Sequence, residues 1–105
     1  MKKLFNICIL LSSVLVANVY AGPHYLSGNI KDLTSNTSGL MIMLDTGVPD
    51  NCAGVSANWM TIEKENTAMI SVALTMWATG KKLGVVYTET RTDGSCIINQ
   101  LDPSN

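Results

Sequence analysis

The sequence has few of the residues from which most catalytic and metal sites are built. Its 105 residues include one histidine, His24, and three cysteines, of which Cys8 lies in an apolar run near the start. His24 would lie two residues from the mature terminus, where a lone histidine is usually solvated, and no Ser-His-Asp or Cys-His set can be assembled around it except by chance. Cys52 and Cys96 are far apart and lack the paired spacing of a zinc site. We therefore expect no enzyme activity, no metal site and no cofactor.

Charge is also scarce. Seven Lys and Arg stand against eight Asp and Glu, and charged residues make up 14% of the chain. Without a basic patch, a nucleic-acid partner is not expected. Asp45 and Asp50 flank a loop with Gly and Pro, but a calcium loop needs more oxygen ligands at regular spacing. A solvated turn is the favoured interpretation of that loop.

The first 21 residues have the composition of a secretory signal peptide. Lys2 and Lys3 precede an apolar run, and Val19 and Ala21 stand at the two positions that signal peptidase reads. The apolar run is too short to span a bilayer comfortably. We expect residues 1–21 to be removed, leaving one small domain without a membrane insertion. Its net charge would be −3, from five Lys and Arg against eight Asp and Glu. The protein would then be periplasmic or secreted.

Two cysteines remain after this cleavage, Cys52 and Cys96. An even number of cysteines in an exported chain predicts a disulfide, and an oxidising compartment disfavours the alternative of two free thiols. The bridge would close a loop of about 45 residues, which the chain-entropy model values at roughly 4 kcal/mol. A domain this small buries only about 60–65% of its unfolded surface, so such a contribution could decide whether it folds alone.

Periodicity and turn residues predict five strands and one helix in residues 22–105. Gly80 is suited to end the helix, and Asp93 and Gly94 form a hairpin-turn dipeptide. The expected strands are 25–33, 40–44, 59–62, 83–90 and 95–101, with the helix at 64–79. The fold class is therefore mainly β with one helix, in the element order β-β-β-α-β-β. This order fits a five-stranded OB-fold-like barrel.

The predicted helix is apolar over an unusually large part of its circumference. Small hydroxyl residues recur at every fourth position, namely Thr67, Ser71, Thr75 and Thr79. Nearly all the other positions are apolar, whereas an ordinary surface helix has an apolar arc of little more than 100°. One sheet covers one side of a helix, so Met69, Met76 and Trp77 are predicted to form an oligomer interface. Filling of the protein's own core is the alternative for Met69 and Met76.

Two short segments resemble a known family. Residues 78–87, ATGKKLGVVY, with the apolar helix before them, look like the helix-to-strand passage of the binding (B) subunits of subtilase cytotoxin and typhoid toxin. Residues 37–42, TSGLMI, are similar to the first-strand segment of the same AB5-type subunits. The resemblance implies a secreted OB-fold subunit. Five copies would form a ring around their helices, bind sialylated glycans on the outer surface and carry an enzymatic subunit.

The resemblance also implies two ligand-binding residues. Ser38 falls on the serine that contacts the sugar carboxylate in those subunits, and Tyr87 falls on a tyrosine that packs beside the sugar. A hydroxyl can donate a hydrogen bond to a carboxylate, and an aromatic face suits the C–H surface of a sugar. Each residue also has a structural interpretation, Ser38 as the opening of a turn before Gly39 and Tyr87 as an ordinary strand residue. The mature chain is shorter than those subunits, has at most one disulfide, and leaves the rest of their sugar site unmatched.

The sequence thus leads to two hypotheses of different kinds. The first is a secreted glycan-binding subunit that assembles as a homo-oligomeric ring and binds a cell-surface glycan. The second is a small periplasmic protein-interaction or inhibitor domain that uses the apolar helix face against a protein partner without binding glycans. The two hypotheses share the exported domain and the helix face, and they differ in the ligand.

Overall fold

The computed structural model describes residues 21–104. Residues 1–20, which hold all but the last position of the predicted signal peptide, lie outside the described residues. The elements follow one another as β1 (Tyr25–Asn36), β2 (Gly39–Leu44), η1 (Asp50–Cys52), η2 (Ser56–Asn58), β3 (Met60–Glu63), α2 (Thr67–Thr79), β4 (Leu83–Thr90) and β5 (Cys96–Pro103). The prediction of a mainly β domain with one helix after the third strand is confirmed. The two 3-10 helices η1 and η2 were not expected.

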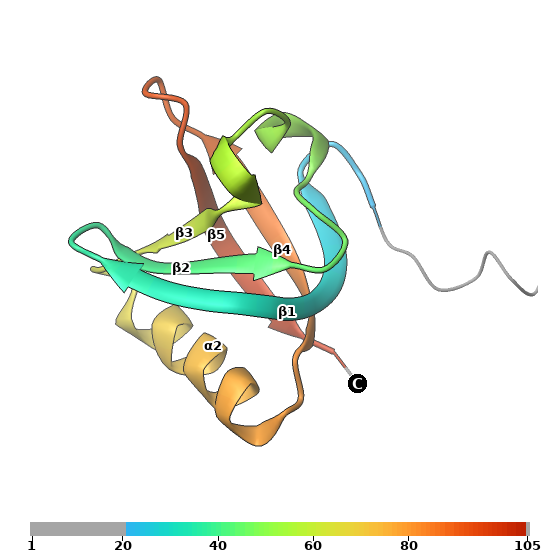
Figure 1. Ribbon diagram of the computed structural model, residues 1–105, viewed down its shortest axis with the longest axis vertical. Helices are drawn as coiled ribbons and strands as arrows, with labels where there is room; N and C mark the ends of the chain where they lie inside the picture. Colours follow the sequence, from blue (N-terminus) through green and yellow to red (C-terminus); the bar gives the residue numbers. More distant parts are fainter. Residues whose placement is uncertain (1–20, 105) are drawn as a thin grey trace, which may run out of the picture.

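The five strands form one sheet that closes on itself in the order β1-β2-β3-β5-β4. All neighbouring strands are antiparallel except β3 and β5, which run parallel where Thr61 lies opposite Ile97. Figure 1 shows α2 on one side of these strands, and the β2–β3 connection with η1 and η2 on the other side. The sheet surface between the β1–β2 turn and the β4–β5 loop is covered neither by α2 nor by the β2–β3 connection.

The first hairpin is longer than its polar composition suggests. We expected a turn over residues 34–39, but β1 continues to Asn36, which lies opposite Gly39 in the β1–β2 ladder. The turn consists of Thr37 and Ser38 alone. The strongly apolar β2 needs a neighbour for its backbone groups, and pairing with it holds the polar end of β1 in strand conformation. Tertiary pairing has overridden local turn preference at this point.

The helix is shorter at its start than predicted. It begins at Thr67, because residues 63–66 form a turn in which the Asn66 N–H donates to the Glu63 carbonyl at 2.9 Å. The preceding Lys64 N–H donates to the Ser38 carbonyl at 3.0 Å, which ties that residue to the first hairpin. The end of the helix is as expected, with Gly80 in the left-handed conformation at φ 76°.

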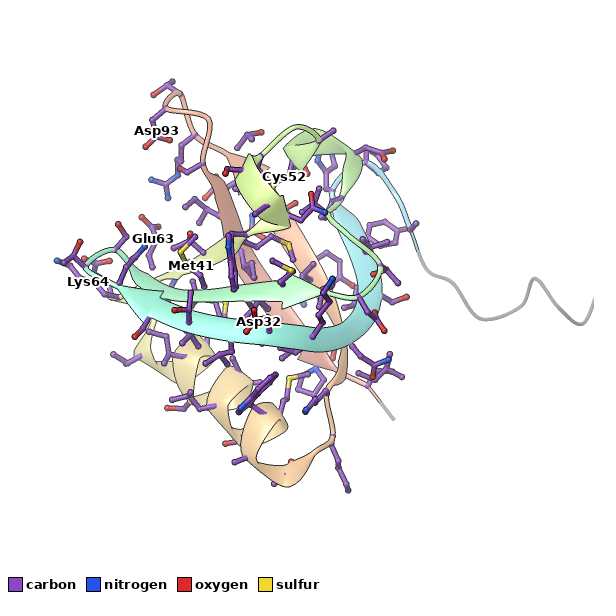
Figure 2. The ribbon with its side chains drawn as sticks, in the orientation of Figure 1. Asp32, Met41, Cys52, Glu63, Lys64 and Asp93 are labelled. Carbon is purple, nitrogen blue, oxygen red and sulfur yellow. A yellow bond between two sulfur atoms is a disulfide. The ribbon has the colours of Figure 1, made fainter. Side chains whose placement is uncertain are left out.

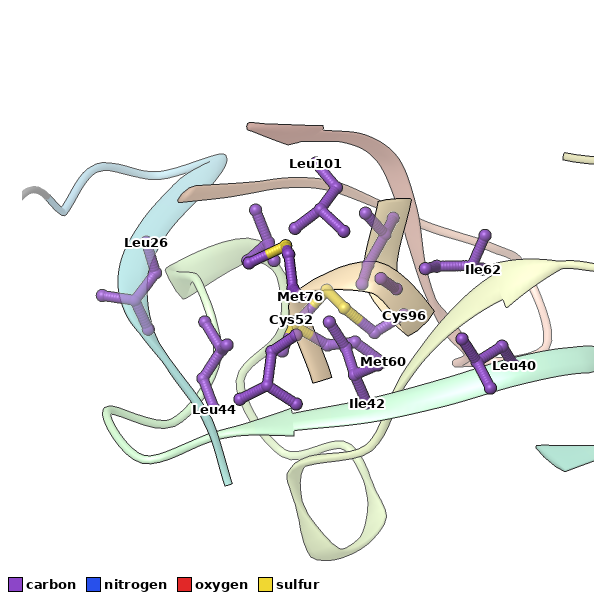
Figure 3. Close-up of a cluster of buried hydrophobic side chains, with 14 residues drawn as sticks. Leu26, Leu40, Ile42, Leu44, Cys52, Met60, Ile62, Met76, Cys96 and Leu101 are labelled. Carbon is purple, nitrogen blue, oxygen red and sulfur yellow. A yellow bond between two sulfur atoms is a disulfide. The ribbon is translucent and has the colours of Figure 1, made fainter. Parts of the chain in front are cut away.

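The core lies inside the closed sheet and combines inward-facing strand residues with one side of α2. Ile42, Met60, Ile62, Val86 and Ile98 have no exposed surface. Figure 3 shows Met76 of the helix beside the Cys52–Cys96 disulfide within this cluster. The predicted disulfide is confirmed, with its Cα atoms 5.5 Å apart. Its burial places the cross-link inside the core, between the β2–β3 connection and the start of β5.

Candidate functional site

A polar groove lies over β2, β3 and β5, between the β1–β2 turn and the β4–β5 loop. Its volume is about 470 Å³. Thr61 and Ile97, paired across β3 and β5, form its floor. Figure 2 shows Glu63 at the end of β3 and Met41 on β2, with Asp93 on the projecting β4–β5 loop. We call this hollow the turn groove. Its polar lining includes Asn36, Ser38, Thr61, Glu63, Arg91, Thr92, Asp93 and Ser95.

The predicted ligand residue Ser38 lies at one end of the turn groove. Its backbone is fixed from both sides: its N–H donates to Asn36 Oδ1 at 2.8 Å, and its carbonyl accepts from the Lys64 N–H at 3.0 Å. The turn role that the sequence left open for Ser38 is therefore present in the backbone. Its hydroxyl makes no hydrogen bond among the described residues. A hydroxyl held on a rigid turn with free donor and acceptor capacity can bind a polar ligand.

Arg91 is the one cation in the lining of the turn groove, and the sequence analysis missed it. Its Nη2 donates to Glu63 Oε1 at 2.7 Å and approaches Glu89 Oε1 at 3.5 Å. Both side chains of the shorter pair are more than a third exposed, so the pair contributes at most about 1 kcal/mol to stability. Its main effect is to hold the guanidinium at the groove. Sequence spacing could not reveal this contact, because 28 positions separate Arg91 from Glu63.

Asp93 stabilises the loop that forms the opposite wall. Its Oδ1 accepts from the Ser95 hydroxyl at 2.6 Å and from the Ser95 N–H at 2.9 Å. These two hydrogen bonds, the side-chain one first, lower the pKa of the Asp93 carboxyl below its ordinary value. Gly94 completes the predicted turn at φ 86°. The carboxylate is therefore ionised at neutral pH and is partly engaged by its own loop.

A second hollow of about 360 Å³ adjoins the turn groove and shares Met41, Thr61, Asp93 and Ser95 with it. Trp59 lines this second hollow and is partly exposed. The backbone just before Trp59 is strained, because Ala57 and Asn58 both have positive φ, at 53° and 60°. Such conformations persist where the surrounding structure holds them, and they are found disproportionately at functional sites.

Tyr87, the other predicted ligand residue, lies away from the turn groove. It is opposite Tyr25 in the β1–β4 ladder, and the two rings are 5.8 Å apart between centroids. Tyr25 is at the start of β1, whereas Ser38 follows the end of the same strand. The structure therefore does not bring Ser38 and Tyr87 into one hollow. A role for Tyr87 in sugar binding stays a prediction, and its packing against Tyr25 fits the ordinary strand interpretation.

The three residues predicted for an oligomer interface have different environments. Met76 is only 4% exposed and packs in the core, which is the alternative that the sequence left open. Met69 is half-buried against the core, and Trp77 is exposed with Lys82 Nζ 4.2 Å from its ring centroid. Leu74 is 45% exposed, the most of any large apolar side chain in residues 21–104. The exposed apolar face of α2 is thus centred on Leu74 and Trp77, which we call the α2 face.

The hydroxyl stripe of α2 is turned toward its own backbone. The hydroxyls of Ser71, Thr75 and Thr79 each donate to the carbonyl four residues earlier, at 2.7–3.0 Å. Their donors are therefore used, and the threonine methyl groups remain for contact. Beside this stripe is a hollow of about 380 Å³, which Val72 and Pro103 also line. The stripe is less polar than its composition suggests.

Metal binding and similarity to known proteins give no further assignment. No group of three or more His, Cys, Asp or Glu side chains within residues 21–104 is placed to hold a metal ion. The same part of the chain contains no helix with the length and apolarity required to cross a membrane. No family model matches the chain, and comparison with curated proteins and with solved structures gives no significant match.

Proposed function

We propose that this protein is an exported glycan-binding subunit on an OB-type barrel, which assembles with further copies of itself. The observation on which the proposal depends is the position of the turn groove. In OB-folds, oligosaccharides bind over strands 2 and 3, between the loop joining strands 1 and 2 and the loop joining strands 4 and 5. The turn groove occupies this position, between Ser38 and the β4–β5 loop.

The lining of the turn groove suits a sugar. Ser38 offers a free hydroxyl, Arg91 offers N–H donors, and the carboxylates of Glu63 and Asp93 offer acceptors. Sugar hydroxyls both donate and accept, so this mixture can satisfy several of them at once. Binding would be shallow, as expected for a groove on the outside of a small barrel. Tyr87 remains a second proposed contact, at the other end of β1.

Assembly is proposed to occur through the α2 face. Leu74 is 45% and Trp77 36% exposed on one helix, so covering the remaining apolar surface contributes only part of the roughly 1.5–3 kcal/mol of a full burial, before the cost of association. A cyclic arrangement would place this face around the symmetry axis. The resemblance to AB5 binding subunits suggests five copies. Native mass spectrometry of the processed protein tests this directly, since a monomer at micromolar concentration would refute the ring.

The glycan proposal is tested by array binding of the processed chain and two serine variants. Ser38→Ala removes the free hydroxyl of the turn groove, and a lost hydrogen bond of about 1 kcal/mol corresponds to roughly fivefold weaker binding. Ser35→Ala is the matched control, because Ser35 is exposed in the same hairpin but does not line the groove. Tyr87→Phe tests the second contact. Failure of the wild-type protein to bind any glycan would refute the proposal.

The alternative function is a periplasmic protein-interaction or inhibitor domain. The hollow beside the hydroxyl stripe favours it, because that hollow is mainly apolar and lies on the same helix as Leu74 and Trp77. This alternative predicts a stoichiometric protein partner in cross-linking of the native compartment, together with an empty glycan array. Substitution of Val72 or Leu74 by Asp should abolish that complex, whereas Ser38→Ala should leave it intact.

A further inference from the structure

We propose that the turn groove and the Trp59 hollow form one extended site, which selects uncharged oligosaccharides of at least two sugar units. This inference rests on the proposed glycan-binding function and specifies its ligand. It combines three observations: the shared lining of the two hollows, the charge around Arg91, and the placement of Trp59. The sialylated ligand implied by the sequence resemblance is the competing ligand.

The length of the site follows from strand geometry. Ser38 is hydrogen-bonded to Lys64, just beyond the end of β3, and Trp59 immediately precedes the start of β3. The four steps from Trp59 to Glu63 cover about 13 Å at 3.3 Å per strand residue. This distance exceeds the width of one pyranose ring. A ligand that contacts both Ser38 and Trp59 therefore needs at least two linked sugars, lying along β3 over the shared floor of the two hollows.

The charge of the lining disfavours an acidic sugar. Two carboxylates, Glu63 and Asp93, line the turn groove, against the single guanidinium of Arg91. Nη2 of that guanidinium already donates to Glu63 Oε1 at 2.7 Å, and Glu89 Oε1 lies 3.5 Å from the same nitrogen. A sugar carboxylate would be repelled by Glu63 and Asp93 in a lining whose net charge is negative, and charges closer together than the Debye length of about 8 Å are little screened. Uncharged hydroxyls can instead bind to Arg91 and the two carboxylates as they stand.

Trp59 supplies the apolar part of the site. Trp59 is partly exposed and lines the second hollow, which the apolar side chains of Val55 and Met41 also line. An aromatic ring packs well against the C–H face of a pyranose, which carries no charge. Ala57 and Asn58, just before Trp59, have positive φ angles, a conformation that the surrounding structure must hold. The second sugar would therefore bind mainly by stacking, and the first mainly by hydrogen bonds.

The decisive experiment compares matched sugars with the processed wild-type protein. An array should carry chitotriose, maltotriose, mannotriose, lactose and N-acetyllactosamine, with the 3′-sialylated forms of the last two and the free monosaccharides. We expect binding to at least one uncharged oligosaccharide, at least tenfold tighter than to its monosaccharide. Where a sialylated form exists, it should bind more weakly than its uncharged parent.

Tryptophan fluorescence identifies the second contact. The chain has two tryptophans, so Trp77→Phe leaves Trp59 as the only one, and its emission should shift when the uncharged oligosaccharide binds. Trp59→Ala should weaken oligosaccharide binding about tenfold and monosaccharide binding little, and Trp59→Phe should restore most of the loss. Preference for sialylated members, or unchanged Trp59 emission at saturation, overturns this inference and leaves glycan binding standing. Absence of all glycan binding refutes the proposed function itself.

Discussion

The turn groove and the helix α2 both present exposed side chains, but their polar groups are satisfied in opposite ways. In the turn groove, the Ser38 hydroxyl has no hydrogen-bond partner among residues 21–104, and the Arg91–Glu63 pair is open to solvent. On α2, the hydroxyls of Ser71 and Thr75 are already bonded to the helix backbone. The groove can therefore exchange hydrogen bonds with a polar ligand, whereas the helix face offers mostly apolar contact. One small domain thus has two chemically distinct surfaces.

Removal of the disulfide should have the largest effect on stability, because the bridge connects the β2–β3 connection to the start of β5. Cys52 lies in η1 and Cys96 begins β5, next to the β4–β5 loop. We expect Cys52→Ser combined with Cys96→Ser to lower the free energy of unfolding by about 4 kcal/mol, from the entropy of the freed loop. Urea denaturation at 10 °C measures the loss. Hydrogen exchange should increase more around η1 and the start of β5 than in α2, and a loss below about 1 kcal/mol would contradict this expectation.

Two nearby positions on α2, Met76 and Leu74, should differ in how much their substitution lowers stability, because the first is buried and the second is exposed. Met76→Ala removes a side chain that is 4% exposed and should destabilise the fold by about 2–5 kcal/mol. Leu74→Ala, two residues earlier on the exposed side, should change the stability of the single chain by about 0.5 kcal/mol or less. Thermal unfolding by circular dichroism compares the two variants at a protein concentration where the chain is monomeric.

The same pair of variants tests whether the α2 face is an interface. If it is, Leu74→Ala should shift the native mass toward a single chain while the unfolding of that chain is almost unchanged. Equal destabilisation by the two substitutions would mean that Leu74 also belongs to the core. An oligomer that survives Leu74→Asp would place the interface elsewhere.

A further test concerns Gly39, which directly follows the turn of the first hairpin. Gly39 has φ +148°, and a Cβ atom there would collide with the Ile62 carbonyl and crowd the Lys64 nitrogen. Gly39→Ala should therefore cost about 1–3 kcal/mol from backbone strain, with the collision in addition. Gly54→Ala is the control, because Gly54 has φ +92° and open space around its Cβ position. Chemical denaturation of both variants isolates the collision, and equal losses would show that the close approach is unimportant.

The sequence predicted the fold better than the site, and the reason is physical. Strands and the helix follow from local periodicity, Gly80 ends the helix, and Gly94 provides the positive φ of the turn between β4 and β5. The end of β1 was missed because its polar residues pair with the apolar β2, a contact that composition does not encode. Ser38 was found through a resemblance, whereas Arg91 and Trp59 join the same surface only once the sheet closes. The alternating burial of β2, with Met41 outward and Ile42 inward, could not be predicted, because the sequence from Leu40 to Leu44 is apolar at every position.

Titration of Asp93 should give the smallest effect. Hydrogen bonds from Ser95 lower the pKa of Asp93 in the folded protein below its ordinary value of 3.8. The ionised form is thus favoured by folding, and its contribution to stability is complete above the unfolded-state pKa and is lost as pH falls through the folded-state pKa. Titration of Asp93 should therefore not change glycan binding between pH 5 and 8, because this pH range lies well above both pKa values.

An NMR titration of the Asp93 carboxyl carbon should give a midpoint below 3.8, with Asp93→Asn as the assignment control. A midpoint at or above that value would mean that the β4–β5 loop is not held by these hydrogen bonds in solution. The turn groove would then lack a rigid wall on that side, whereas the α2 face would be unaffected.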